Sequence, residues 1–253
     1  HRVPAYNAST GSLTYNNGGA YTIAGEWPAT NQPANVSLIA SGTNVILTGD
    51  RTISGVLTLT EGTITTSSNS VYVSNNASAA VVRTNGYVIG NLKRAIATGT
   101  NSYAYPIGTA AGYTPATITL NGVTGAGDIT ATTLNGASSN YPAGLSTTKR
   151  LARYWNLSSS GVSGFTASVQ FDYLGADLVG GATASSIKAY QFTSPSTYNY
   201  PSFTTGTNSL TVSGLSSLSE FGAGECDGSG PASSIDPQDA TPNAIHASSD
   251  AWC

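Results

Sequence analysis

Charged side chains are scarce in this chain of 253 residues, at only 8% of the sequence, compared with about a quarter in a typical soluble domain. Nine basic residues stand against 12 acidic ones, which excludes a continuous basic track for nucleic-acid phosphates. The hydrophobic share is still 39%. The chain therefore has enough apolar side chains to build a core, and disorder throughout is excluded.

Methionine and long hydrophobic runs are absent. No stretch approaches the roughly 18 apolar residues of a membrane-spanning helix, so we expect no membrane span. The sequence starts at His1 and contains no Met. We therefore expect a secreted protein, extracellular or at the cell surface, whose signal peptide has already been removed.

Cysteine is nearly absent too, with only Cys226 and Cys253 present. In an oxidising compartment we expect these two to form a disulfide that closes the tail between them. Pairing between two chains is the alternative. Catalytic thiols are not expected, because neither cysteine has a neighbouring pattern of His and acid.

Helical periodicity is missing, whereas strand signals are dense. From about residue 35 to residue 90 the strands are short and closely spaced, with Asn and Ser at the expected corners. This spacing favours a short β-solenoid, in which each coil covers the apolar face of the previous one. A compact antiparallel sandwich gives a similar pattern and stays open as the alternative.

Longer strands follow from about residue 104, with aromatic residues alternating with Thr and Val and a turn every 8–14 residues or so. We expect an antiparallel β-sandwich of about seven strands here. Its predicted core residues are Trp155, Phe165, Phe171, Tyr173 and Phe221. The chain as a whole is thus expected to be all-β, with an N-terminal arm (1–26), a solenoid-like module (27–101), a sandwich (102–225) and an irregular tail (226–253).

Several segments resemble large secreted surface and adhesin-like proteins of the Bacteroidetes, of the kind exported as type IX secretion cargo. They are GEWPATNQPANVSLIASGTNVILTGDRTISGVLTLTEGTITT, YAYPIGTAAGYTPATITL, RYWNLSSSG, VQFDYLGADL and SLSEFGAGE. The resemblance covers about residues 25–225 and implies surface display, adhesion or gliding. The first 24 residues and the Cys-bounded tail depart from it, and the chain is far shorter than a typical adhesin.

Residues for enzyme chemistry are few. No G-x-S-x-G motif occurs, and the two histidines, His1 and His246, lie near the chain ends. A polysaccharide-cleaving site would need paired carboxylates or an acid beside a base. The available groups are Asp50–Arg51, Glu61 and Lys93–Arg94, and each is typical of a turn or strand end. We expect no catalytic residue, so an enzyme is the least favoured function.

No metal or other cofactor is expected. Asp227, Asp236 and Asp239 could form a weak calcium site in the tail, but no calcium-binding repeat is present. A solvated acidic loop is the preferred interpretation.

The N-terminal arm contains two strand-like runs outside the family-like region. Its apolar and aromatic residues are Val3, Tyr6, Leu13, Tyr15, Tyr21 and Ile23. Such an arm can add a strand to a neighbouring subunit and so build a head-to-tail filament. The alternative is that it pairs as the first strand of its own domain.

Three functions are compatible with these patterns. Low charge removes electrostatic self-repulsion, which favours a non-enzymatic structural subunit of an extracellular filament or surface assembly whose partners are copies of itself. A monomeric adhesion or glycan-binding module is the alternative, with Tyr198 and Tyr200 as candidate glycan contacts. A polysaccharide-active solenoid enzyme comes third.

Overall fold

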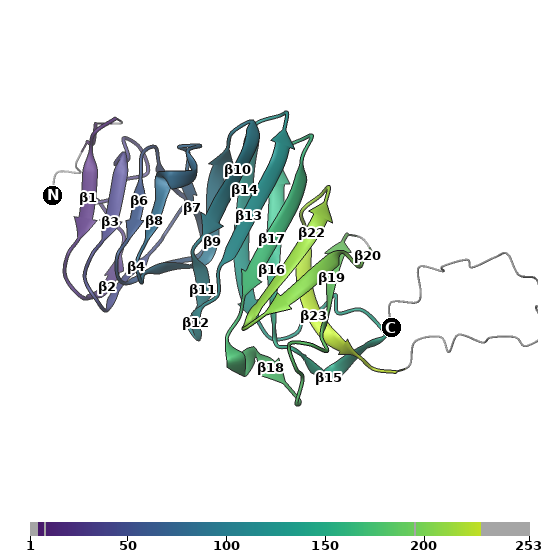
Figure 1. Ribbon diagram of the computed structural model, residues 1–253. Coiled ribbons are helices and arrows are strands. Elements are labelled where there is room, and N and C mark those ends of the chain that lie inside the picture. The colour runs from purple at the N-terminus through teal and green to yellow at the C-terminus, as the bar shows by residue number, and fades with distance from the viewer. Residues whose placement is uncertain (1–4, 8, 195, 229–253) are drawn as a thin grey trace, which may run out of the picture.

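The computed structural model describes residues 5–7, 9–194 and 196–228 and is all-β (Figure 1). Within these ranges the chain forms strands and two short 3-10 helices, η1 (Ser78–Ala80) and η2 (Gly175–Asp177), and no α-helix. Three sheets result, which we name by their strand pairing: a short parallel sheet, a long sheet and an antiparallel sheet.

The first part of the chain is solenoid-like, because it alternates between two sheets of parallel strands. The short parallel sheet has the order β1 (Ser12–Tyr15), β3 (Asn35–Leu38), β6 (Leu57–Leu59), β8 (Val81–Arg83). Facing strands in the long sheet are β2 (Gly19–Thr22), β4 (Thr43–Ile46), β7 (Thr63–Val73) and β9 (Tyr87–Ile96), with β5 (Arg51–Ile53) beside β7. The predicted solenoid-like arrangement is confirmed.

Stacked apolar side chains fill the solenoid. One inward row in the short parallel sheet runs through Leu13, Val36, Leu57 and Val81. The long sheet supplies a second row, Tyr21, Val45, Ile64, Val88 and Ile107. Because side chains alternate in direction along a strand, Ser and Thr between these positions face solvent. The alternation in the sequence therefore directly encodes the two faces of each coil.

Polar strand side chains and a corner glycine hold successive coils together. Asn44 Oδ1 accepts hydrogen bonds from the hydroxyls of Thr63 (3.2 Å) and Thr65 (2.8 Å) in the next coil. At one corner Gly62 has a φ of +76°, and a Cβ there would lie 2.6 Å from the Thr43 carbonyl oxygen. Only glycine fits this corner without strain.

The long sheet continues from the solenoid into the second half of the molecule. Strand β9 pairs in parallel with β7 on one side and antiparallel with β14 (Gly127–Asn135) on the other. Beyond β14 follow β16 (Arg153–Ser160), β23 (Glu220–Cys226), β15 (Leu145–Leu151) and β18 (Leu178–Val179). Four further strands also pair within the long sheet: β11 (Ile107–Thr109), β12 (Gly112–Tyr113), β19 (Lys188–Thr193) and β20 (Thr197–Asn199).

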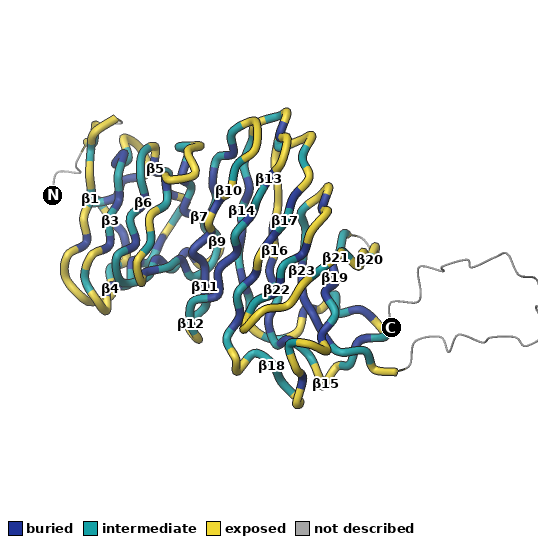
Figure 2. Tube along the Cα trace, viewed as in Figure 1, coloured by how far each residue is buried: buried dark blue, intermediate teal, exposed yellow. Residues whose placement is uncertain are grey.

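The antiparallel sheet covers this second half and completes a sandwich. Its order is β10 (Gly99–Tyr105), β13 (Ala116–Val123), β17 (Thr166–Asp172), β22 (Ser209–Leu215), β21 (Ser202–Gly206). The buried layer between the sheets is visible as dark blue segments in Figure 2. Phe171 packs on Trp155 (4.7 Å between ring centroids) and on Phe221 (5.2 Å).

The predicted aromatic core is largely confirmed. Trp155, Phe171, Phe221 and Tyr173 are buried, and Phe165 is partly buried against the same cluster. That cluster extends without a break into the solenoid. The predicted module boundary between residues 101 and 102 falls inside β10 of the antiparallel sheet. The long sheet contains strands from both sides of this boundary.

A buried arginine joins the two halves at this point. Arg94, on β9, donates from Nη1 to the Ala104 carbonyl (2.7 Å) and from Nη2 to the carbonyls of Ala77 (3.1 Å) and Ser78 (2.8 Å). Its guanidinium also lies near the ring of Tyr103. Burial lowers the pKa of Arg94. This side chain ties the end of the solenoid to the first strand of the antiparallel sheet.

The two predicted terminal segments are only partly described. Strands β1 and β2, from the predicted arm, form the first coil of the solenoid within the same chain; exchange between chains stays a prediction. Strand β23 ends at Cys226, whereas Val3, Cys253 and most of the tail lie outside the described residues. The predicted Cys226–Cys253 disulfide therefore also stays a prediction.

Candidate assembly edge and surface grooves

At the N-terminal end of the solenoid, two sheet edges have no partner strand in the part of the chain that the structure describes. Strand β1 is the last strand of the short parallel sheet, and β2 ends the long sheet on the same side (Figure 1). Among the described residues, no strand pairs with the outer edge of either one. Uncovered edges of this kind present backbone donors and acceptors to another chain.

The backbone hydrogen bonds show which groups point outward. Asn35, the first residue of β3, donates its N–H to the Gly11 carbonyl (2.9 Å). Ile39, the residue after β3, donates its N–H to the Tyr15 carbonyl (3.0 Å). Peptide groups alternate in direction along a strand, so the N–H and C=O of Thr14 face the open edge.

The same alternation applies to β2. Gly19 and Ile23 donate to the carbonyls of Gly42 (3.0 Å) and Ile46 (3.0 Å). The peptide groups of Ala20 therefore face outward. Both edges offer unpaired backbone groups at the same end of the molecule.

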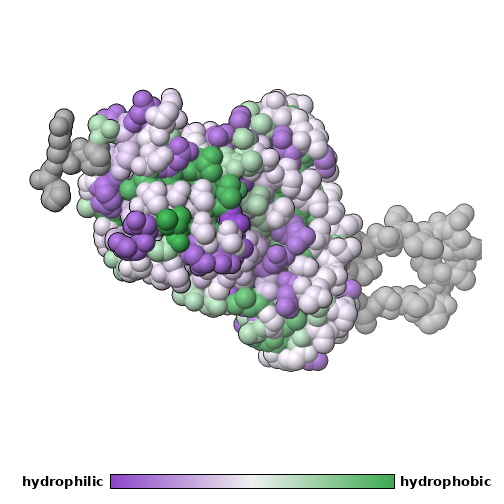
Figure 3. Space-filling model, turned by 60° about the vertical axis from the view of Figure 1, so that its left-hand side comes forward, coloured by the Kyte–Doolittle hydropathy of each residue, from purple (hydrophilic) through white to green (hydrophobic). Residues whose placement is uncertain are grey.

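The side chains at this end carry no charge between residues 5 and 25. The rings of Tyr15 and Tyr21 meet across the two sheets, 5.6 Å apart, and close the core of the first coil. Burial, followed by the nearby Glu26 carboxylate, raises the pKa of Tyr15. Figure 3 shows the solenoid side of the molecule, where hydrophobic residues form small separate groups among polar ones.

The predicted arm residues differ in their roles. Tyr15 and Ile23 are buried, and Leu13 and Tyr21 are half-buried against the core. Tyr6 donates its hydroxyl to the Glu26 carbonyl at 2.6 Å. Four of the described arm residues thus belong to the solenoid core or its margin, so the end coil is built by the segment that the sequence singled out.

At the opposite end of the molecule the long sheet is blunted. Its last strand, β18, has two residues, and β15 next to it carries Lys149 and Arg150 and an irregular register. These are features that discourage edge pairing. The antiparallel sheet ends differently, because its edge strand β21 (Ser202–Gly206) is uncharged and largely exposed.

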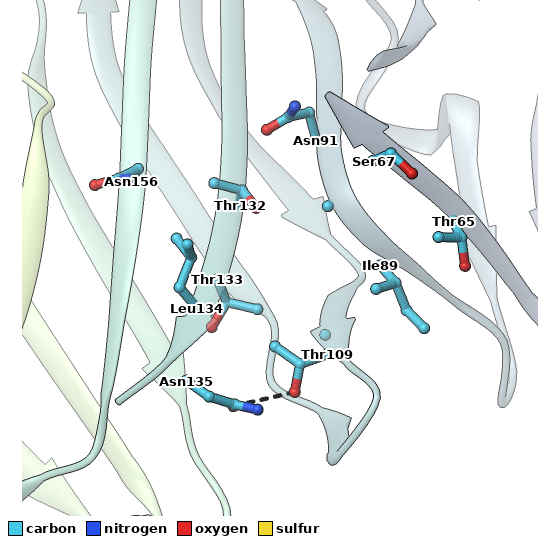
Figure 4. Close-up of a pocket in the computed structure, with 12 residues that line it drawn as sticks. Thr65, Ser67, Ile89, Asn91, Thr109, Thr132, Thr133, Leu134, Asn135 and Asn156 are labelled. Carbon is cyan, nitrogen blue, oxygen red and sulfur yellow. Dashed lines mark hydrogen bonds between the residues drawn. The ribbon is translucent and has the colours of Figure 1, made fainter. Parts of the chain in front are cut away.

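A first groove of about 440 Å³ lies on the outer face of the long sheet, where solenoid and sandwich join (Figure 4). Ile89 and Leu134 contribute apolar surface, and Asn91, Asn135 and Asn156 contribute amides from three different strands. The first two amides are already engaged: Asn91 Nδ2 donates to the Asn69 carbonyl at 3.0 Å, and Asn135 Oδ1 accepts from the Thr109 hydroxyl at 3.1 Å.

A second groove of about 430 Å³ lies at the far end of the sandwich. It is bordered by the β19–β20 hairpin, by β21 and β22, and by the loop that precedes β23. Gln191, Asn199 and Tyr200 line it together with several serines. Neither groove is lined by a charged side chain.

The charged residues considered for catalysis in the sequence have structural partners in the solenoid. Asp50 accepts from the Ser70 N–H (2.8 Å) and hydroxyl (3.1 Å) of the next coil, and Glu61 accepts from Asn85 Nδ2 (2.7 Å). Arg51 points the other way, donating from Nε to the Trp27 carbonyl at 2.9 Å. These residues brace the solenoid corners and do not meet in one site.

Lys93 belongs to a cluster that the sequence pattern did not indicate. Its Nζ lies 3.0 Å from Asp128 Oδ2, and Tyr72 donates its hydroxyl to Asp128 Oδ1 at 2.7 Å. Burial and this hydrogen bond raise the pKa of Tyr72 to about 12. A phenol with a raised pKa is a poor general base at neutral pH. The three residues come from β7, β9 and β14, so only the sheet register brings them together.

One serine lies close to a carboxylate. Ser138 donates its hydroxyl to Glu220 Oε1 at 2.5 Å, and Asn140 Nδ2 donates to Glu220 Oε2 at 3.2 Å. A serine nucleophile needs a base whose orientation is itself fixed. Both histidines of the sequence lie outside the described residues, so this pair serves as a loop anchor in the part of the chain that is described.

No group of three or more His, Cys, Asp or Glu side chains gathers among the described residues. Asp236 and Asp239 of the predicted tail loop lie outside them. No helix in the described part of the chain is long and apolar enough to span a membrane.

Comparison of the chain with protein-family models, with curated proteins and with solved structures finds no match. The sheet edges and the two grooves described above are therefore the features that bear on function.

Proposed function

We propose that this protein is a non-enzymatic structural subunit of an extracellular filament or surface assembly, which grows by pairing between sheet edges of successive copies. The observation that carries the proposal is the uncovered, uncharged N-terminal end, where β1 and β2 both present outward backbone groups.

The absence of edge protection supports the proposal. Natural sheets commonly shield their edges with lysine, proline, bulges or very short strands. Neither β1 nor β2 contains a charge or a proline, whereas the far end of the long sheet has a two-residue strand and basic residues. The contrast indicates that one end of the long sheet is left available.

A head-to-tail contact would need an acceptor on the next copy, and β21 fits that role. The short parallel sheet and the antiparallel sheet both pack against the long sheet, one after the other along the molecule (Figure 1). Strand β21, with five residues, matches the four of β1 in length, and both are uncharged. Pairing β1 with β21 of a neighbour would continue one layer along the filament axis.

An extracellular location is part of the same proposal. Its support is the low charge of the chain and the resemblance of residues 25–225 to secreted surface proteins of the Bacteroidetes. A disulfide between Cys226 and Cys253 would suit that setting.

The test compares the same substitution at an edge and at the centre of the short parallel sheet. Thr14 on β1 and Thr58 on β6 lie in one outward-facing row, linked through Ser37 of β3. Thr14→Lys places a charge on the open edge, and Thr58→Lys places the same charge on a strand that is paired on both sides. We expect wild-type protein and T58K to form regular polymers in negative-stain electron microscopy, and T14K to remain dispersed.

A proline variant sharpens the result. Thr14→Pro removes an N–H that makes no bond to the described residues, so it should block polymers while keeping the fold, as checked by circular dichroism. Wild-type protein that stays monomeric at high concentration would refute the proposal. Equal polymerisation of T14K, T14P and T58K would refute the role of the β1 edge.

A further inference from the structure

The second groove contains a buried polar side chain whose acceptor atom has no partner in the described structure. Gln191, on β19, is 3% exposed and lines the groove. Its Nε2 donates to the Ser217 carbonyl at 3.0 Å and lies 3.4 Å from the Ser217 hydroxyl. No hydrogen bond to Gln191 Oε1 occurs among the described residues.

The orientation of this amide follows from its donor bond. Because a backbone carbonyl only accepts, the nitrogen of Gln191 must face Ser217. The oxygen then faces away from Ser217. Gln191 Oε1 is not one of the fully buried polar atoms without a partner, so a ligand hydroxyl in the groove could donate to this oxygen in place of water.

An aromatic ring and a second amide complete the groove wall. Tyr200 is 36% exposed, which places it among the three most exposed large hydrophobic residues described. Asn199 stands directly opposite Gln191 in the β19–β20 register. Groups of this kind, an apolar surface with a few placed polar atoms, are typical of small-molecule sites.

The structure separates the two tyrosines that the sequence placed together. Tyr198 packs its ring on Phe192 at 5.1 Å, and the register pairs these two residues with each other. Tyr198 does not line the groove, whereas Tyr200 does. Alternation along β20 (Thr197–Asn199) separates Tyr198 from Asn199, whereas Tyr200 follows the end of the strand and reaches the groove from there.

We propose that this groove binds uncharged carbohydrate, with the Tyr200 ring against the C–H face of a sugar and Gln191 Oε1 accepting a sugar hydroxyl. Asn199 supplies a further amide. A sugar offers both an apolar ring face and many hydroxyl donors, which matches this combination of groups. The absence of charged lining residues favours neutral over acidic sugars.

The first groove does not share these properties. It has neither an aromatic ring nor a nine-tenths-buried polar side chain with an open acceptor among its lining residues, and two of its three amides are engaged within the protein. It therefore serves as an internal control. Sugar binding is proposed independently of polymer formation, although Ser202 of β21, the proposed acceptor strand, also lines this groove.

The experiment is isothermal titration of the full chain with four hexasaccharides: cellohexaose, maltohexaose and chitohexaose as neutral probes, and hexagalacturonate as an acidic probe. We expect at least one neutral probe to bind more tightly than the acidic one. Tyr200→Ala should weaken that binding by roughly tenfold or more, because the ring contact is lost. Tyr200→Phe keeps the ring and should stay within about threefold of the wild type.

Two bulky substitutions distinguish the grooves. Ser216 is exposed and lines the second groove, and Asn156 is exposed and lines the first. Ser216→Trp should abolish binding, and Asn156→Trp should leave it unchanged, with urea unfolding confirming that each variant is folded. Failure of every neutral probe to bind at millimolar concentration would overturn the inference. So would stronger binding of hexagalacturonate, unchanged binding by Y200A, or loss of binding in N156W alone.

Discussion

The solenoid and the sandwich use the same alternating pattern of apolar and hydroxyl residues but build different cores with it. In the short parallel sheet of the solenoid, strands of three or four residues stack aliphatic side chains in rows from coil to coil. In the sandwich, strands of seven to nine residues interlock rings such as Trp155 and Phe171. A stack of coils leaves its end open for another layer, and we therefore propose the solenoid end as the growth edge. The sandwich keeps the open edge strand β21, which we propose as its acceptor.

The buried arginines repeat this contrast. Arg153, in the sandwich, is paired with Asp177 at 2.6 Å between Nε and Oδ2. Arg94, at the junction, is held by three backbone carbonyls, and no carboxylate pairs with it among the described residues. Carbonyls at strand ends and turns are available where a solenoid stops, so a planar guanidinium can serve as its cap.

The largest expected effect tests whether the two regions unfold together. Phe171→Ala removes the central ring of the sandwich and should lower the free energy of unfolding by about 3–5 kcal/mol. Leu57→Ala in the solenoid should cost about 2–5 kcal/mol. Because one continuous core joins the regions, we expect each variant to shift a single urea transition, followed by tryptophan fluorescence and circular dichroism. Two separate transitions would show that the regions are independent.

Loss of the acidic partner in the sandwich should have the next largest effect. Asp177→Ala leaves the Arg153 guanidinium buried without its carboxylate and removes the bond from the Leu174 N–H to Asp177 Oδ2. The expected loss of unfolding free energy is about 3 kcal/mol or more. Asp172→Ala, which removes a carboxylate that accepts an exposed hydrogen bond from Gln170 Nε2, provides the control in the same urea titration. Similar losses in the two variants would contradict a special role for the buried pair.

Replacement of Arg94, at the junction between solenoid and sandwich, by lysine should lower the free energy of unfolding. Arg94→Lys keeps the charge but cannot reach three carbonyls with a planar fork, and we expect a loss of roughly 2 kcal/mol. Arg83 is partly exposed, so Arg83→Lys should cost less than about 1 kcal/mol. Equal stability of R94K and the wild type in chemical unfolding would rule out this tie between solenoid and sandwich.

A pH titration distinguishes the two regions more finely. The raised pKa of Tyr72, about 12 against an ordinary 10.0, means that the folded state holds this proton more tightly than the unfolded state. The resulting stabilisation is complete below pH 10 and is lost as the pH rises through about 12. Asp128→Asn should lower the pKa of Tyr72, because the hydrogen bond to an anion is gone.

Tyr141 in the sandwich serves as the reference for that titration. Burial raises its pKa to about 12, with no carboxylate involved. Phenolate absorbance of D128N, with Tyr72→Phe used to assign the signal, should show earlier ionisation of Tyr72 and no change at Tyr141. An unchanged Tyr72 would mean that burial alone sets its pKa.

The smallest effect is expected at an exposed ion pair. Lys149 Nζ lies 3.9 Å from Glu225 Oε2, and the lysine side chain is 55% exposed. Lys149→Ala should change the free energy of unfolding by less than about 0.5 kcal/mol. A larger change in urea unfolding would indicate that β15 depends on this contact.

Much of the strand content was predictable from the sequence, because alternation is a local property. Residues 12–15 and 35–38 are strands as their patterns indicate. The strands expected from residue 35 to residue 90 were short, but β7 (Thr63–Val73) has 11 residues, with a register irregularity against β9. A local pattern does not reveal such a bulge.

The grooves and clusters were less predictable. Tyr200 was identified from its surroundings in the sequence, but Gln191 was not, since a lone glutamine in a strand carries no signal. Its significance comes from Ser217, 26 residues away. Tyr72, Lys93 and Asp128 likewise meet only because β9 is shared between parallel and antiparallel partners.

Composition and alternation were enough to establish an all-β chain with little charge, a change of texture near residue 104 and a short list of aromatic core residues, because these depend on each residue and its near neighbours. Which edges remain open, which tyrosine reaches a groove and which buried arginine has an acid beside it depended on sheet order and register. Those are set by packing between distant segments, where a shift of one residue turns every side chain of a strand to the other face.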